Sequence, residues 1–187
     1  VIYIRSPNLS TPYSTSSITT ASKTPKAAVV PSSRKGAGME VLIDNQQSLL
    51  SIPNENLKRT ATDILSALGC PDGELSLLIV DDEKITPLNQ EYRGRSGPTN
   101  VLAFSMNEGA FADVTPHLLG DVVISVETCQ REAQSAGISF ERHFTELLIH
   151  GILHLFGYDH EQSEEEEHRM ATKSEKILLQ LEYMLEM

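Results

Sequence analysis

Three of the six histidines in this chain lie within one short segment, HGILHLFGYDH. His150 and His154 are four residues apart, so on a helix their rings lie on one face and can reach a single ion. Gly157 can end that helix in a left-handed conformation, which lets the chain turn back and bring His160 to the same point. A given histidine acquires partners at both spacings by chance with a frequency of ~0.001. The spacing therefore predicts a metal site with His150, His154 and His160 as ligands.

Three neutral imidazoles would leave a tetrahedral zinc ion with one open position, which is typical of catalytic zinc sites. Zinc in such a site activates water near pH 7 without help from a carboxylate. One Zn²⁺ is the expected cofactor, although three histidines also suit another divalent transition metal such as Ni²⁺ or Cu²⁺. Asp159 is expected either to orient a ligating histidine or to serve only the turn. The remaining histidines, His117, His143 and His168, are expected to be solvated or hydrogen-bonded.

The residue after the first of these histidines is Gly151, where zinc proteases with this spacing carry a glutamate as general base. Without that carboxylate, nothing at this position can take the proton of the attacking water and pass it to a leaving amine. Peptide cleavage needs this transfer far more than phosphodiester cleavage does. The site therefore favours phosphodiester hydrolysis, and a metalloprotease that uses a glutamate from elsewhere is the first alternative.

The residues around the motif predict a single α+β domain with about four strands in a mixed sheet and about five helices. Apolar residues from Phe140 to Leu155 follow a helical period, so the metal motif should lie in the last turns of a buried helix that Ser139 caps. We expect strands at 40–44, 74–80, 100–105 and 120–125, and helices near 56–68, 81–94, 126–136, 139–156 and 162–185.

The first 38 residues differ in composition from the rest of the chain. They contain five basic residues, no acidic residue, thirteen Ser or Thr and four Pro. Such a segment cannot bury enough apolar surface to offset its ordering entropy, so we expect it to be disordered. Because Met39 resembles a natural start, residues 1–38 are interpreted as translated from upstream or added in cloning, with a Ser-rich transit peptide as the alternative. The hydrolase domain is then expected to span residues 39–187.

Three segments, in this order, resemble the YbeY family of metal-dependent endoribonucleases, which act in ribosomal RNA maturation and ribosome quality control. They are LNQEYRGRSGPTNVLAFS, LLGDVVIS and HGILHLFGYDH, and the match runs from about Met39 to the C-terminus. The resemblance implies that His150, His154 and His160 bind zinc and that Arg93 is the basic residue needed for RNA cleavage. It also implies a single α+β domain with the metal at the base of a cleft.

Arg93 also has a physical reason to take that role. A guanidinium stays charged and offers a fork of donors that fits phosphate oxygens, so near the metal it could hold the scissile phosphate. Arg95 is expected to add a contact to the RNA backbone. Taken alone, the two arginines could instead be solvated residues at a helix C-terminus. Ser96 and Gly97 stand where the family usually has an aspartate and often a lysine, which leaves open how Arg93 is positioned.

The charge of the folded part limits how the protein can meet RNA. Residues 39–187 hold 10 basic and 26 acidic residues, a net charge of −16, so nonspecific affinity for a polyanion should be weak and salt-sensitive. We expect a zinc-dependent endoribonuclease for single-stranded RNA in ribosomal RNA processing, with the RNA bound in a local basic cleft or presented by ribosomal small-subunit components. A ribosome-associated binding module with structural zinc is the second alternative.

Location and redox state follow from the remaining composition. Apolar runs such as ELLI and SLLIV are far shorter than a membrane span, so no membrane partner is expected, and no DNA partner either. Cys70 and Cys129 occur in no paired motif, which favours buried free thiols in a reducing compartment. We expect a cytoplasmic protein, or an organellar one if residues 1–38 are a transit peptide.

Overall fold

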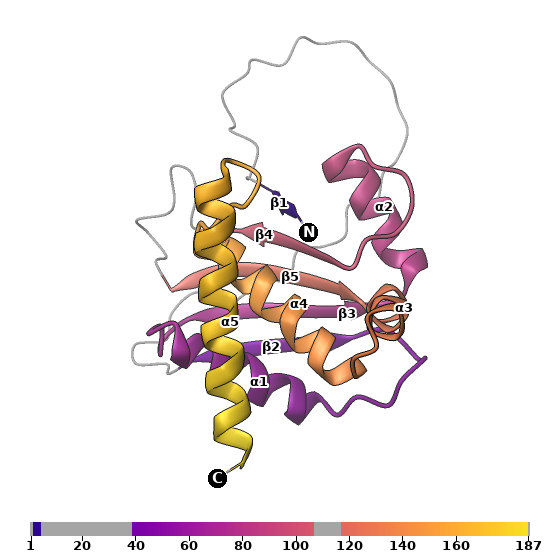
Figure 1. The fold of residues 1–187 in the computed structure, drawn as a ribbon. Coiled ribbons are helices and arrows are strands. Elements are labelled where there is room, and N and C mark those ends of the chain that lie inside the picture. Colours follow the sequence, from indigo (N-terminus) through magenta and orange to yellow (C-terminus); the bar gives the residue numbers. More distant parts are fainter. Residues whose placement is uncertain (1, 5–38, 107–116, 187) are drawn as a thin grey trace.

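A computed structural model of the protein describes residues 2–4, 39–106 and 117–186 and contains one β-sheet covered by helices (Figure 1). The strands are β1 (Ile2–Ile4), β2 (Glu40–Asn45), β3 (Glu74–Val80), β4 (Val101–Ser105) and β5 (Leu118–Ser125). The helices are α1 (Asn54–Ala67), α2 (Asp82–Arg93), α3 (Val126–Ala136), α4 (Phe140–Leu155) and α5 (Glu164–Glu186). Among the described residues, no helix combines the length and the apolar character needed to span a membrane.

The sheet is mixed, with the strand order β1-β4-β5-β3-β2. Strands β2, β3 and β5 run parallel to one another, whereas β4 runs antiparallel to β5 and parallel to β1. The four expected strands are β2 to β5, and their ends lie within two residues of the predicted ones. The five expected helices also occur where they are predicted. The predicted α+β fold with a mixed sheet is thus confirmed.

Strand β1 is an addition to the predicted sheet. It pairs with the edge of β4, with Ile2 opposite Leu102 and Ile4 opposite Phe104. It lies inside the segment 1–38, and the expected disorder of that segment stays a prediction. The pairing of β1 with β4 is expected physically, because an edge strand offers unpaired backbone groups to a short run of β-forming residues such as IYI. Residues 5–38 lie outside the described part of the chain.

Both faces of the sheet bury apolar side chains, because successive residues of a strand point to opposite faces. In β3, Leu75, Leu77 and Ile79 belong to the larger core, to which α1, α4 and α5 contribute. Leu78 and Val80 face the smaller cluster, to which α2 contributes Ile85 and Leu88. The helix that carries the histidines therefore packs on one face, and the helix that ends at Arg93 packs on the other.

Helix α4 is the central helix of the larger core and lies against β4 and β5 (Figure 1). The helix packs closely on the sheet at Gly151, where an added Cβ would lie 2.8 Å from Cγ1 of Val122 and 3.2 Å from Cγ2 of Val101. Real Cβ atoms essentially never come within 3.0 Å of such neighbours. Glycine at this position thus allows the helix to approach the sheet and fixes the depth at which its histidines lie.

Candidate metal centre

The structure brings together the three histidines that the sequence spacing selects. One ring nitrogen of each histidine lies within 4.8 Å of those of the other two, and Nε2 of His150 is 3.0 Å from Nε2 of His154. The ring of His160 completes the cluster, with its centroid 5.2 Å from that of His150 and 5.3 Å from that of His154. Three imidazoles converging in this way could hold one metal ion.

The turn after α4 returns the chain to the two helical histidines. The N–H of Gly157 donates to the carbonyl of His154, and the N–H of Tyr158 donates to the carbonyl of Leu153. These two bonds form a Schellman motif, which requires a left-handed residue at the position after the C-cap. Gly157 meets this requirement with a φ of +83°. The turn then brings His160 back beside His150, as the glycine in the sequence predicts.

Burial keeps the helical histidines neutral. His154 is completely buried, with 0% exposure. Burial, with a smaller contribution from His160, lowers the pKa of His154 to about 4. Burial, followed by the neighbouring His154 and His160, lowers the pKa of His150 to about 3. Metal ligation requires neutral imidazoles, so both side chains are in the ligating form at neutral pH before any ion binds.

No carboxylate can act from position 151. The Cβ position of Gly151 is directed at Val122 and Val101 of the sheet, so a longer side chain here would have to displace the core. The glutamate that zinc proteases carry at this point is therefore absent from the sequence and also poorly accommodated by the packing. This observation weakens the protease alternative.

Arg93 lies beside the turn that carries His160. It ends α2, and Gly94 follows it in a left-handed conformation. Its side chain is only 15% exposed, and its Nη2 lies 3.2 Å from Oε1 of Glu161, the residue after His160. Arg93 is therefore not the freely solvated arginine that the local sequence alone would allow. Arg95 is exposed and makes no ion pair within the described ranges.

Asp159 serves the turn. Its Oδ1 accepts a hydrogen bond from the backbone N–H of Glu161 at 3.0 Å, and its Oδ2 accepts one from Nε2 of Gln162 at 3.0 Å. Partial burial alone would raise the pKa of Asp159, but these two hydrogen bonds outweigh it and hold the pKa below its ordinary value. The turn role is thus supported by direct hydrogen bonds, and the charge of Asp159 also interacts with His154 and His160.

Two residues near the site escape the sequence analysis. Asn89 is buried, and its Nδ2 donates to the carbonyl of Gly97 at 2.9 Å, which ties the loop after α2 to the helix. Glu161 holds Arg93. In the sequence, Asn89 stands out only as a polar residue four positions after Ile85 of α2. Glu161 stands out only as an acid next to a predicted metal ligand. Asn89 thus contacts the loop that has Ser96 and Gly97 in place of the usual aspartate and lysine, and Glu161 contacts the end of the helix before that loop.

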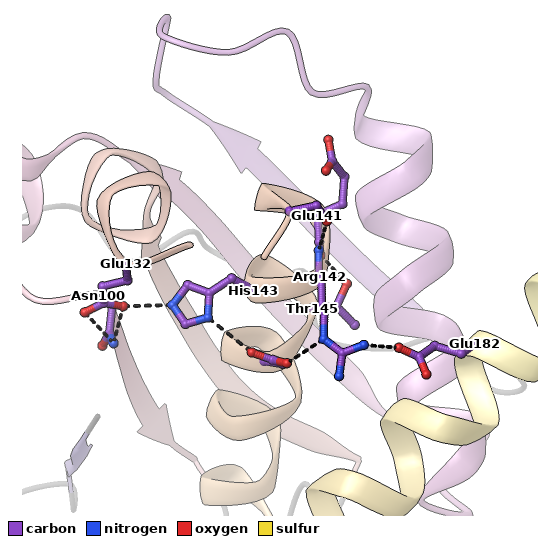
Figure 2. Close-up of polar contacts among 9 residues, drawn as sticks. Asn100, Glu132, Glu141, Arg142, His143, Thr145 and Glu182 are labelled. Carbon is purple, nitrogen blue, oxygen red and sulfur yellow. Dashed lines mark hydrogen bonds and ion pairs between the residues drawn. The ribbon is translucent and has the colours of Figure 1, made fainter. Parts of the chain in front are cut away.

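The other histidines lie outside the cluster, as expected. His143 bridges two carboxylates, with Nε2 at 2.9 Å from Glu132 and Nδ1 at 3.2 Å from Glu146. Figure 2 shows this bridge as part of a polar chain that joins Asn100 before β4 through α3 and α4 to α5. His117 and His168 are exposed. Cys129 is buried, whereas Cys70 is only partly buried, and both are free thiols.

The cluster opens into a groove between α4 and α5. His150 and His160 line this groove together with the apolar Leu147, Met170 and Leu178. The groove has a volume of ≈ 630 Å³, and the acids Glu146, Glu167 and Glu175 also contribute to its walls. His150 and His160 are therefore accessible to a substrate from this groove, whereas His154 is buried.

This is a mixed α+β domain in which two histidines of a buried helix and one from the following turn converge, and two of the three line a groove. Such a site is typical of a metal-dependent hydrolase. The family model described as Endoribonuclease YbeY matches residues 42–182. The chain therefore belongs to the YbeY family of endoribonucleases.

Several relatives support this assignment. The chain is 48% identical to Endoribonuclease YbeY of Geobacter sulfurreducens over 145 residues. The aligned region covers 77% of this chain and 97% of that protein. It is 49% identical over 127 residues to the protein of the same name from Syntrophotalea carbinolica, which covers 68% of this chain and 85% of that protein. A solution structure from Thermotoga maritima matches with a TM-score of 0.54 at 31% identity, over 74% of this chain and 86% of that one.

Proposed function

We propose that His150, His154 and His160 bind one zinc ion and that this site cleaves single-stranded RNA. The observation that carries the proposal is the convergence of three histidines, with one ring nitrogen of each within 4.8 Å of those of the other two. Zinc binds imidazole nitrogen at about 2.0–2.1 Å, which corresponds to ligand nitrogens about 3.3 Å apart in a tetrahedral site. The observed cluster fits this requirement with small side-chain adjustments.

The donor set favours a catalytic over a structural metal. Within the described residues, the metal-binding group consists of the three histidines, with no cysteine, aspartate or glutamate as a fourth member. Structural zinc sites usually close with four protein ligands. When bound here, zinc supplies Lewis acidity and an activated water near neutral pH. This argues against the binding module in which zinc only holds the fold.

Arg93 is proposed to bind the scissile phosphate and to stabilise the charge that develops on its oxygens. The guanidinium is mostly buried next to the turn of His160, so it is already desolvated and directed by its surroundings. Its Nε is buried and has no hydrogen-bond acceptor in the described part of the chain. Nε is closed to solvent as it stands, so a phosphate oxygen would reach it only after the side chain moves, and it would then displace no existing partner. The exposed Arg95 is proposed to contact the RNA backbone nearby.

The biological setting proposed for this activity is ribosomal RNA processing in the cytoplasm, with ribosomal small-subunit components as partners. The support comes from the family and from charge. A body with 26 acidic and 10 basic residues from position 39 onward repels free RNA, so presentation of the substrate by a ribosomal particle would help the encounter. We further propose that residues 39–187 form the hydrolase domain, because the family match begins at residue 42.

A cleavage assay tests the proposal. Zinc-loaded protein, chelator-treated protein and the His154→Ala variant are each incubated with labelled single-stranded RNA, and product formation is followed. Cleavage by the zinc-loaded parent that is lost in the other two samples is the expected result. Equal cleavage in all three samples would show that the histidine cluster is not the site, and a parent that cuts no RNA under any metal condition would contradict the proposal itself.

A further inference from the structure

Glu161 makes a contact that none of the functions assigned so far requires. Its Oε1 lies 3.2 Å from Nη2 of Arg93, and the two residues are 68 positions apart in the chain. The Glu161 side chain is 46% exposed, whereas the Arg93 side chain is 15% exposed. Ion pairs with an exposed partner contribute little to stability. The contact is therefore better explained by what it does to Arg93 than by what it adds to the fold.

The backbone of Glu161 is fixed by the turn that forms the metal site. Its N–H donates to Oδ1 of Asp159 at 3.0 Å, and the same turn is entered through the left-handed Gly157. His160 and Glu161 are adjacent, so the turn that brings a histidine to the metal cluster also brings a carboxylate to the arginine. When His160 is fixed at the metal cluster, the position of Glu161 is therefore restricted as well.

On the arginine side, the loop after α2 supplies no acid in the described structure. Gly94 ends the helix, Ser96 is exposed, and Gly97 is held through its carbonyl by Asn89. The carboxylate that orients the guanidinium therefore comes from the metal turn and not from the loop. Nη2 of Arg93 donates to Glu161, while Nε of Arg93 is buried without an acceptor in the described part of the chain. One edge of the guanidinium is thus held by Glu161, and the buried Nε has no partner among the described residues that would compete with this contact.

We propose that Glu161 is a positioning residue that holds the Arg93 guanidinium in the orientation that binds the scissile phosphate. Because Glu161 adjoins the ligand His160, the same turn couples metal binding to the placement of the arginine. The inference rests on the role proposed for Arg93. Its physical basis is that a forked donor binds phosphate well only when its orientation is fixed, and a misplacement of about 1 Å can lower a rate by up to about a hundredfold.

The test uses the full-length, zinc-loaded protein and four variants. Glu161→Gln removes the charge but keeps the shape, Glu161→Ala removes both, and Glu161→Asp restores the charge on a shorter side chain. Glu165→Gln is the matched control, because Glu165 is an exposed acid of the neighbouring α5 with no ion pair among the described residues. Loss of any negative charge makes the protein more attractive to RNA, and the Glu165→Gln variant measures this general effect. Zinc content, kcat and KM are measured for each protein on labelled single-stranded RNA.

We expect every variant to bind zinc like the parent. Glu161→Ala and Glu161→Gln should lower kcat/KM by roughly tenfold or more, mainly through kcat. Glu161→Asp should recover part of the loss, and Glu165→Gln should match the parent. Cleavage by Glu161→Ala that equals or exceeds that of Glu165→Gln would overturn the proposal, because the contact would then be neutral or would compete with the phosphate.

A double-mutant cycle separates positioning from an independent effect. In an Arg93→Ala background, Glu161→Ala should cause no further loss, since there is no guanidinium left to position. Single-turnover rates keep the slow variants measurable. A further loss equal to that in the parent would show that Glu161 acts without Arg93 and would overturn the proposal. If Arg93→Ala itself cleaved like the parent, the role proposed for Arg93 would fail instead, and if the parent cut no RNA the endoribonuclease function would fail.

Discussion

At position 151, a side chain larger than hydrogen would meet the sheet before it could serve the histidines. An added Cβ would lie 2.8 Å from Cγ1 of Val122. The close packing of α4 on β5 and the missing general base therefore have one cause. A hydrolase with this helix must do without a carboxylate next to its first histidine, which suits phosphodiester cleavage better than peptide cleavage.

Gly151→Ala should destabilise the protein. The added methyl group must push Val122 aside in a filled core, which should lower the free energy of unfolding by about 1–3 kcal/mol, even though alanine favours a helix over glycine by about 1 kcal/mol. Urea denaturation measures the change. Ser135→Ala, at an exposed position of α3, is the control and should be neutral or slightly stabilising. A Gly151→Ala variant as stable as the parent would refute the close approach.

The residues of the site differ in how far the sequence could predict them. His150, His154 and Gly157 were predictable because a helical turn and a Schellman motif are local, so spacing alone determines which groups meet. The pairing of Arg93 with Glu161 was not predictable, since it joins residues 68 positions apart through the fold. Asn89 was missed for a similar reason, because its partner Gly97 lies in a loop whose path depends on tertiary packing.

At the scale of elements, the start of α2 is tied to the end of β5 and to α3 by the carboxylate of Asp82. Its Oδ1 accepts hydrogen bonds from Ser125 Oγ and Thr128 Oγ1, both at 2.6 Å, and its Oδ2 accepts one from Arg131 at 2.7 Å. Partial burial would raise the pKa of Asp82, but these hydrogen bonds outweigh it and lower the pKa. The network fixes the helix whose other end carries Arg93.

Asp82→Asn should destabilise the protein in a pH-dependent way. The folded pKa of Asp82 lies below the unfolded value of about 3.9, so its stabilisation is fully present above that pH and is lost as the pH falls through the folded pKa. At pH 7 the variant should lose about 1–3 kcal/mol of unfolding free energy. Urea denaturation at pH 7 and at successively lower pH should show the difference from the parent shrinking only below about pH 4. A difference that is constant down to pH 3 would contradict this assignment.

Among the elements, the helices and the strands β2 to β5 could be predicted from the periodicity of apolar residues and from capping residues. Ser139 and Ser125 accept hydrogen bonds at the starts of α4 and α3 through their side chains. Strand β1 could not be predicted in this way, because three residues are too few for a period and their partner strand β4 lies about a hundred residues away. Its position depends on which sheet edge is open.

For the whole molecule, charge determines how RNA can bind. The chain from position 39 has a net charge of −16, and the cationic groups proposed to meet phosphate are Arg93 and Arg95. Two phosphate contacts on single-stranded RNA correspond to a slope of about −1.4 in a plot of log affinity against log salt. The protein should therefore bind RNA weakly. Its affinity should still fall with salt, but less steeply than that of a protein that coats nucleic acid.

Measurement of RNA affinity by fluorescence anisotropy between about 50 and 200 mM salt tests this prediction. The parent should give the shallow slope, and Arg95→Ala should reduce its magnitude by about 0.7 while weakening all RNA sequences alike. A slope as steep as about −6 in the parent would mean that many more cations contact the RNA than the two arginines.

The most direct test of the central claim is a titration of zinc into the metal-free protein with RNA cleavage followed at each step. The three-histidine site predicts that the rate rises in proportion to bound zinc and reaches its maximum at one ion per chain, and that His154→Ala stays inactive throughout. Cleavage by the metal-free protein, or a maximum that requires a second bound ion, would contradict a single zinc site at His150, His154 and His160 as the origin of the ribonuclease activity.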